Sequence, residues 1–244
     1  MPSQSIPILP VAAVTVTVAT LAVLLYWMVR MLRLDTDERL KGEIELLVNS
    51  LGRVTPPIDP TQLKKLHDQA DFPRMLGWIK NSMRLDLRVG IRIVDSGPDR
   101  TPMWIETPRA MAPFGTEEFR RTRVIVNVRK DVLDRYPFEW IVAGFAHELA
   151  HVVLFATGHP LQHSERAVDL AAMIAGYRNF VIKTDNTKIH GGVFAVTFAM
   201  LALPLGLLFI PGHTKSSLGY LTRGEKRTAR SILEKIEKAN RTTN

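Results

Sequence analysis

Two long runs of hydrophobic residues stand apart from the rest of this chain, and the first covers residues 6–29. It contains 24 residues without a charge. A helix of that length would extend about 36 Å, enough to cross a hydrocarbon core of about 30 Å. We predict a transmembrane anchor over residues 1–32 rather than a cleaved signal peptide, because the leader has no Lys or Arg and no small-residue cleavage site follows. Arginines follow directly, so the positive-inside rule places the bulk of the chain in the cytoplasm.

The second uncharged run, residues 191–212, lies between His190 and His213 and is interrupted by Pro204 and Gly206. Its length favours a second membrane span. A span would place the basic carboxyl end outside, however, whereas a re-entrant hairpin bent at the interruption would keep both basic flanks on one side. We therefore expect a second membrane segment that is either spanning or re-entrant, with a buried helix as the remaining alternative.

Between the two runs, the spacing of apolar residues predicts both helices and strands. Residues 85–93 alternate between apolar and polar side chains, which is typical of a strand with one buried and one solvent-facing side. Residues 138–156 are apolar nearly all round and predict a buried helix. The other predicted elements are helices at residues 34–51 and 61–80 and strands at residues 103–105 and 124–128. This order indicates one α+β domain over residues 33–190.

Positive charge is concentrated at the carboxyl end. The whole chain carries a net charge of +8, and residues 213–244 hold eight Lys or Arg against three Glu, which leaves only +3 for the rest. Thr222 and Glu225 have the spacing of a capping box at the start of a helix. The apolar stripe of that helix comprises Ala229, Ile232, Leu233 and Ile236. Beside a membrane segment, we expect this basic amphipathic tail to bind anionic lipid rather than nucleic acid, although a helix packed on the domain explains the pattern equally well.

The candidate chemistry lies within the buried helix, where residues 147–151 read His-Glu-Leu-Ala-His. Because His147 and His151 are one helical turn apart, both imidazoles can meet a single zinc ion. Glu148 is placed beside them to accept a proton from a metal-bound water. The chain has no Cys, which excludes cysteine-ligated metals and thiol nucleophiles, and it contains no phosphate-binding loop or nucleophile-elbow motif.

A hydrolytic zinc site needs a third protein ligand. Glu165 and Asp169 lie one turn apart at the start of the next predicted helix, so both carboxylates share a face. The loop from residue 157 to residue 163 is long enough to bring that helix back against the first. Asp169, His159 and His163 remain alternatives to Glu165 as the third ligand.

With HExxH on one helix and ExxxD on the next, the chain resembles the gluzincin class of zinc metallopeptidases. The resemblance implies a zincin-like α+β domain with a small, mostly antiparallel sheet, an active-site helix and a second ligand helix. It implies one Zn²⁺ per chain, ligated by His147, His151 and Glu165, with Asp169 orienting a ligand histidine. It also implies that an edge strand before the active-site helix holds the substrate peptide, a role expected for Val124, Val126 and Val128. The 13 residues between His151 and Glu165 are fewer than is usual in the class.

Together these features predict a membrane-anchored zinc metallopeptidase with its catalytic domain on the cytoplasmic side, acting on a protein or peptide with Glu148 as general base. Tyr177, two helical turns after Asp169, and His190 are candidates for stabilising the oxyanion. The alternative is a non-catalytic, metal-binding membrane adaptor or sensor. A non-haem iron site lacks the additional carboxylate and histidine motifs that it would need.

Overall fold

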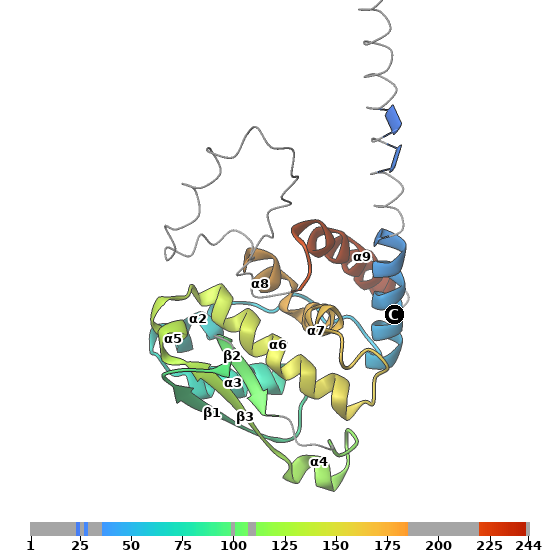
Figure 1. Cartoon of the computed structure of the whole chain (residues 1–244). Helices are drawn as coiled ribbons and strands as arrows, with labels where there is room; N and C mark the ends of the chain where they lie inside the picture. Colours follow the sequence, from blue (N-terminus) through green and yellow to red (C-terminus); the bar gives the residue numbers. More distant parts are fainter. Residues whose placement is uncertain are drawn as a thin grey trace, which may run out of the picture. The chain divides into compact units, whose positions relative to one another are not determined.

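The computed structural model describes residues 23–24, 27–28, 36–98, 101–106, 111–184 and 220–242. Of the predicted anchor, only residues 23–24 and 27–28 are described, and they are helical. The predicted second membrane segment, residues 191–212, and His190 lie outside the described residues. The chain divides into two compact units, residues 1–43 and 44–244. The second unit is a mostly helical α+β structure with a three-stranded sheet (Figure 1).

Helix α6 (Phe138–Ala156) is the central element of this unit. It contacts strand β2, helix α3 and helices α7 and α8 (Figure 1). Because it is covered on several sides, most of its side chains are buried, as its nearly uniform apolar sequence predicts. Among the described residues, it is the one helix long and apolar enough to cross a membrane, and 72% of its apolar window is buried inside the protein. The prediction of a buried helix at residues 138–156 is confirmed.

The sheet consists of β1 (Arg88–Val94), β2 (Met103–Glu106) and β3 (Arg123–Arg129), in the order β1-β3-β2. Strand β1 pairs with β3 in parallel, and β2 pairs with β3 in antiparallel orientation. The sheet is therefore mixed, and the expectation of a mostly antiparallel sheet is wrong. Two short helices flank β3, namely α4 (Glu117–Arg121) and α5 (Lys130–Arg135).

Strand β3 lies in the middle of the sheet, so the prediction that it forms the substrate-binding edge is wrong. Its backbone is occupied by β1 on one side and β2 on the other. The predicted substrate-contacting side chains, Val124, Val126 and Val128, are fully buried in the core. These valines alternate with other residues because one face of this central strand is buried. An edge strand with one buried face shows the same alternation, so the sequence pattern does not distinguish the two.

Three helical segments precede the sheet. Residues 36–51 are helical, and Ile44 and Leu47 of the predicted apolar face are buried. The single helical region expected at residues 61–80 is two helices, α2 (Thr61–Asp68) and α3 (Phe72–Ser82). The chain turns between them because Ala70 adopts a positive φ of 54° and Asp71 caps α3 by accepting a hydrogen bond from the Arg74 backbone N–H at 3.2 Å.

The second predicted helix of the site is interrupted near its middle. It consists of α7 (Glu165–Ala172), the π-helical turn η2 (Met173–Tyr177) and α8 (Arg178–Lys183). The interruption falls at Gly176, whose φ is 102°. Here the backbone of residues 55–58 approaches closely, and Ile58 N–H donates to the Gly176 carbonyl at 3.0 Å. A Cβ on Gly176 would lie 2.6 Å from the Pro56 carbonyl oxygen, so only glycine fits this contact.

The basic tail forms helix α9 (Arg223–Thr242), which packs against α8 (Figure 1). The predicted capping box is present: Thr222 N–H donates to the Glu225 carboxylate at 2.7 Å, and Glu225 N–H donates to Thr222 Oγ1 at 3.3 Å. Of the predicted apolar stripe, Ala229 and Leu233 are fully buried. Helix α9 is therefore part of the packed unit, whereas its predicted binding to anionic lipid stays a prediction.

Candidate metal centre

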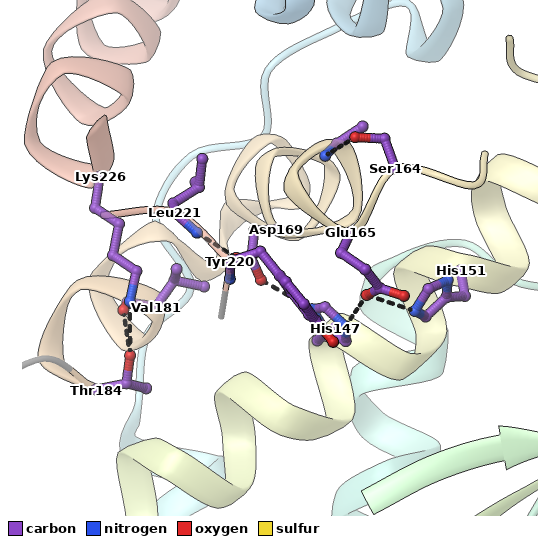
Figure 2. A network of polar contacts seen from close by, with 11 residues as sticks. His147, His151, Ser164, Glu165, Asp169, Val181, Thr184, Tyr220, Leu221 and Lys226 are labelled. Carbon is purple, nitrogen blue, oxygen red and sulfur yellow. Dashed lines mark hydrogen bonds and ion pairs between the residues drawn. The ribbon is translucent and has the colours of Figure 1, made fainter. Parts of the chain in front are cut away.

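His147 and His151 lie one turn apart on α6, and their imidazole centroids are 5.1 Å apart. Both side chains are largely buried, with exposed fractions of 12% for His147 and 16% for His151. Each directs its Nε2 atom towards α7 (Figure 2). The i, i+4 spacing of the motif thus places both rings on the same face of α6, as predicted.

Glu165 completes the group from the first turn of α7. The Ser164 hydroxyl caps this helix by accepting a hydrogen bond from the Ala167 N–H at 3.4 Å. Glu165 Oε2 lies 3.2 Å from His147 Nε2 and 3.4 Å from His151 Nε2 (Figure 2). One ligand atom from each of the three residues lies within 4.8 Å of the others, which makes the group able to hold a metal ion.

Asp169 lies behind this group and accepts hydrogen bonds on both carboxylate oxygens. Its Oδ1 is 2.8 Å from His147 Nδ1, on the side of the ring opposite the ligand nitrogen. Its Oδ2 accepts from the backbone N–H groups of Tyr220 at 2.6 Å and Leu221 at 3.2 Å (Figure 2). With both oxygens occupied, Asp169 is placed to orient His147 rather than to act as the third ligand.

Charge and hydrogen bonding stabilise a positive charge on His147 and a negative charge on Glu165. Burial opposes a charge on His147, but hydrogen bonds to Asp169 and Glu165 outweigh it and raise the pKa of His147 to about 10. Hydrogen bonds from His147 and His151 lower the pKa of Glu165 well below its usual range. A cation at this position, whether a proton or a metal ion, is therefore stabilised by two carboxylates.

Glu148 is buried beside the histidines, with 8% of its surface exposed. Burial raises the pKa of Glu148, while the charges on His147 and His151 and the backbone of Ile105 in β2 act in the opposite direction. The side chain thus lies at the contact between α6 and the edge strand β2. A carboxyl group in that position is within reach of both the metal centre and a chain lying along β2.

The other predicted site residues have different surroundings. Tyr177 was expected on the face of Asp169, but the turn η2 and the positive φ of Gly176 change the helical phase before it. Tyr177 is fully buried, and its hydroxyl contacts Ser82 Oγ in α3. This environment does not favour a role at the oxyanion, which stays a prediction. His190 lies outside the described residues.

The two loop histidines are not part of the group. His159 is buried, and its Nδ1 accepts a hydrogen bond from the Leu161 N–H at 3.1 Å. His163 packs its ring against Phe155 at 5.3 Å between centroids. Both side chains stabilise the turn between α6 and α7, so neither competes with Glu165 for the third ligand position.

Tyr220 is a residue of the site that sequence analysis missed. Its ring stacks on His147, with centroids 6.2 Å apart and planes 21° from parallel, and 60% of its surface is exposed (Figure 2). It lies 51 residues after Asp169. No local spacing connects it to the motif, and its only signal in the sequence is its place just before the capping box at Thr222.

The donor set fits a divalent metal ion. Two imidazoles and one carboxylate, with a second carboxylate behind one imidazole, form a common ligand arrangement for hydrolytic zinc. The arrangement is consistent with a site of the HExxH type. Comparison with models of known protein families, with curated proteins and with solved structures found no match. The assignment of function therefore depends on the geometry of this site.

Proposed function

We propose that this chain is a zinc metallopeptidase that hydrolyses peptide bonds in a protein or peptide substrate. The observation that carries the proposal is the convergence of the ligand atoms of His147, His151 and Glu165 beside a buried carboxyl group, Glu148. A scaffold that only held a metal would need the three ligands and no adjacent base. A peptidase needs both.

The chain's residues divide the chemistry between them. His147, His151 and Glu165 hold the ion, which when bound supplies a Lewis acid that polarises the scissile carbonyl and acidifies water. Glu148 accepts the proton of the attacking water and returns it to the leaving amine. Asp169 fixes the orientation of the His147 ring through the 2.8 Å contact to Nδ1.

We assign the substrate-binding edge to β2 (Met103–Glu106). It is an outer strand of the sheet, it contacts α6, and its residue Ile105 lies close enough to Glu148 to act on its pKa. A peptide added in extended form along the side of β2 that faces away from β3 would place its backbone beside the general base. Strand β2 therefore takes the role that the sequence suggested for β3.

Tyr220 is the best-placed donor for the oxyanion among the described residues. Its ring stacks on His147 beside the ligand group, and its phenol is protonated at neutral pH, because partial burial and the charges of Glu165 and Asp169 raise its pKa. The geometry supports Tyr220 in the role that was expected for Tyr177 or His190.

Our proposal places this catalytic unit at the cytoplasmic face of a membrane. The support is the uncharged run of residues 6–29, the arginines that follow it and the second uncharged run at residues 191–212. A substrate that is membrane-associated or unfolded suits an extended binding mode on β2.

The experiment compares peptide cleavage by the full chain, purified in detergent, with cleavage by Glu148→Gln. Zinc content is measured on the same samples. We expect about one zinc per chain in both proteins and a loss of cleavage of about a thousandfold or more in the variant. Equal zinc content with no cleavage by either protein, across casein and a quenched-peptide library, would instead support the metal-binding adaptor.

A further inference from the structure

A pocket lies on the far side of the two helices that carry the candidate metal ligands. It is an open cavity of about 420 Å³ lined by the carboxyl end of the helix at residues 36–51, the end of α3, the last turns of α6 and the junction of α7 with η2. Val153 and Ala171, which line it, are each two residues beyond a residue of the metal centre and so point about 200° away round their helices. None of the metal-centre residues lines this cavity.

The walls of the cavity are largely apolar. They include Leu51, Met83, Phe114, Val153, Ala171 and Ile174. Phe114 is 48% exposed, although its backbone N–H is fixed by a 3.0 Å hydrogen bond to the Ala156 carbonyl. An apolar ring held in this way at the cavity, and left half in solvent, provides a contact surface for an apolar ligand.

Two arginines also line the cavity, Arg53 and Arg84. Both are exposed, and within the described parts of the chain neither side chain pairs with a carboxylate. Among the other polar residues of the lining, the Ser82 hydroxyl is engaged by the Ile79 carbonyl and Tyr177, and the Thr157 hydroxyl by the carbonyls of Val153 and Leu154. The positive charge at this cavity is therefore available to an anion from outside the described structure.

Arg84 stands at a backbone position that favours glycine. Its φ is 58°, and its N–H donates to the Asn81 carbonyl at 2.9 Å, which ends α3. The left-handed conformation fixes the direction in which the side chain leaves the backbone. Glycine adopts this conformation without strain, so Arg84→Gly removes the charge and is not expected to destabilise the fold. The variant can therefore test ligand binding without a loss of folding.

We propose that this cavity binds the anion of a long-chain fatty acid, with the acyl chain against the apolar wall and the carboxylate on Arg53 and Arg84. The two arginines favour a negatively charged head group, and the apolar lining favours a hydrocarbon tail. The volume lies near the lower end of the range of about 300–1,000 Å³ for ligand pockets, which suits one acyl chain better than the two of a phospholipid. The site is independent of the proposed peptidase activity.

The test is equilibrium binding of radiolabelled oleate to the full chain, which is immobilised on a support and kept in solution with a non-ionic detergent. The variants are Arg84→Gly, Arg53→Gln and, as the matched control, Arg227→Gln, which removes an exposed arginine of α9 that does not line the cavity. Thermal unfolding of each variant is measured alongside. Two unlabelled competitors are added: oleyl alcohol, which has the acyl chain without the negative charge, and inorganic phosphate, which has negative charge without an acyl chain.

We expect saturable binding of one oleate per chain, weakened on the order of tenfold or more by Arg84→Gly and by Arg53→Gln and changed less than about twofold by Arg227→Gln. Arg84→Gly should unfold at no lower temperature than the wild type. If Arg84→Gly unfolds at a lower temperature than the wild type, the proposal is judged on the binding by Arg53→Gln alone. Absence of saturable binding, equal weakening by Arg227→Gln, or competition by oleyl alcohol or phosphate as effective as that by oleate would each overturn the proposal.

Discussion

The backbone N–H of Tyr220 donates a 2.6 Å hydrogen bond to the carboxylate of Asp169, although 51 residues separate the two. The other oxygen of Asp169 contacts His147, a residue of the candidate metal centre. The side chain of Asp169 thus joins the start of the carboxyl-terminal segment to the candidate metal centre, in addition to the stacking of the Tyr220 ring on His147. Helix α9, which follows Tyr220, is attached to α7 and α8 by two ion pairs, Arg166–Glu225 and Arg178–Glu237.

Asp169→Asn should weaken metal binding while leaving the three ligands in place. In the carboxylate, one oxygen faces His147 Nδ1 and the other accepts from the Tyr220 and Leu221 N–H groups. An asparagine that keeps its oxygen on the two backbone N–H groups turns its NH2 group towards His147 Nδ1, so the acceptor for that nitrogen and the ring orientation are lost. We expect zinc affinity to fall about 10- to 100-fold, measured by competition with a chromophoric chelator. An affinity equal to that of the wild type would show that Asp169 does not position His147.

Tyr220→Phe should lower the turnover number of the proposed peptidase about a hundredfold, because it removes only a hydroxyl donor. The stacked ring is retained, so zinc content should not change. Cleavage of a quenched peptide, with kcat and KM determined separately, checks this. Turnover equal to that of the wild type would remove Tyr220 from the mechanism, and a loss of zinc would assign it a structural role.

Acid should loosen the contact between α7 and α9. Burial acts to raise the pKa of Glu225, but hydrogen bonds from Arg166 and Thr222 outweigh it and hold the pKa below its usual range. A carboxyl group whose pKa is lower in the folded than in the unfolded state stabilises the fold above about pH 4.5, and this contribution disappears as the pH falls through the folded-state value.

Glu225→Gln removes that contribution at every pH. We therefore expect the variant to be less stable than the wild type at pH 7 and the difference to shrink towards pH 3, measured by urea unfolding. Glu234→Gln, on the same helix, removes an exposed pair with Arg230 and should change stability little. A difference between Glu225→Gln and wild type that stayed constant with pH would contradict this account.

Gly176→Ala should destabilise the protein by about 2 kcal/mol or more, because alanine is strained at a φ of 102° and its Cβ would lie 2.6 Å from the Pro56 carbonyl oxygen. The matched control is Gly77→Ala within α3, where a Cβ meets nothing within 4 Å. That change should stabilise by about 0.5–1 kcal/mol, since alanine is the better helix former. Chemical unfolding of both variants tests whether their effects have opposite signs.

The sequence predicts much of this site because its signals are local. The i, i+4 spacing of His147 and His151, and of Glu165 and Asp169, holds wherever the two segments are helical, and the reach of the loop between them allows the two helices to pack. The burial of α6 follows equally from its uninterrupted apolar composition. These elements need no knowledge of the rest of the fold.

The features that the sequence did not predict depend on distant contacts. Strand order is set by which neighbours pair, so the alternation of Val124 and Val126 could not distinguish a central from an edge strand. Tyr177 leaves the expected face because the backbone of residues 55–58 packs against Gly176. Tyr220 reaches His147 only through the docking of α9.

X-ray absorption at the zinc edge, on the full chain loaded with one equivalent of zinc, tests the central claim most directly. The account predicts two imidazole nitrogens at about 2.0–2.1 Å and carboxylate oxygen in the remaining protein position, with the carboxylate contribution lost in Glu165→Ala. A bound zinc with one imidazole or none, or a spectrum unchanged by Glu165→Ala, would contradict it.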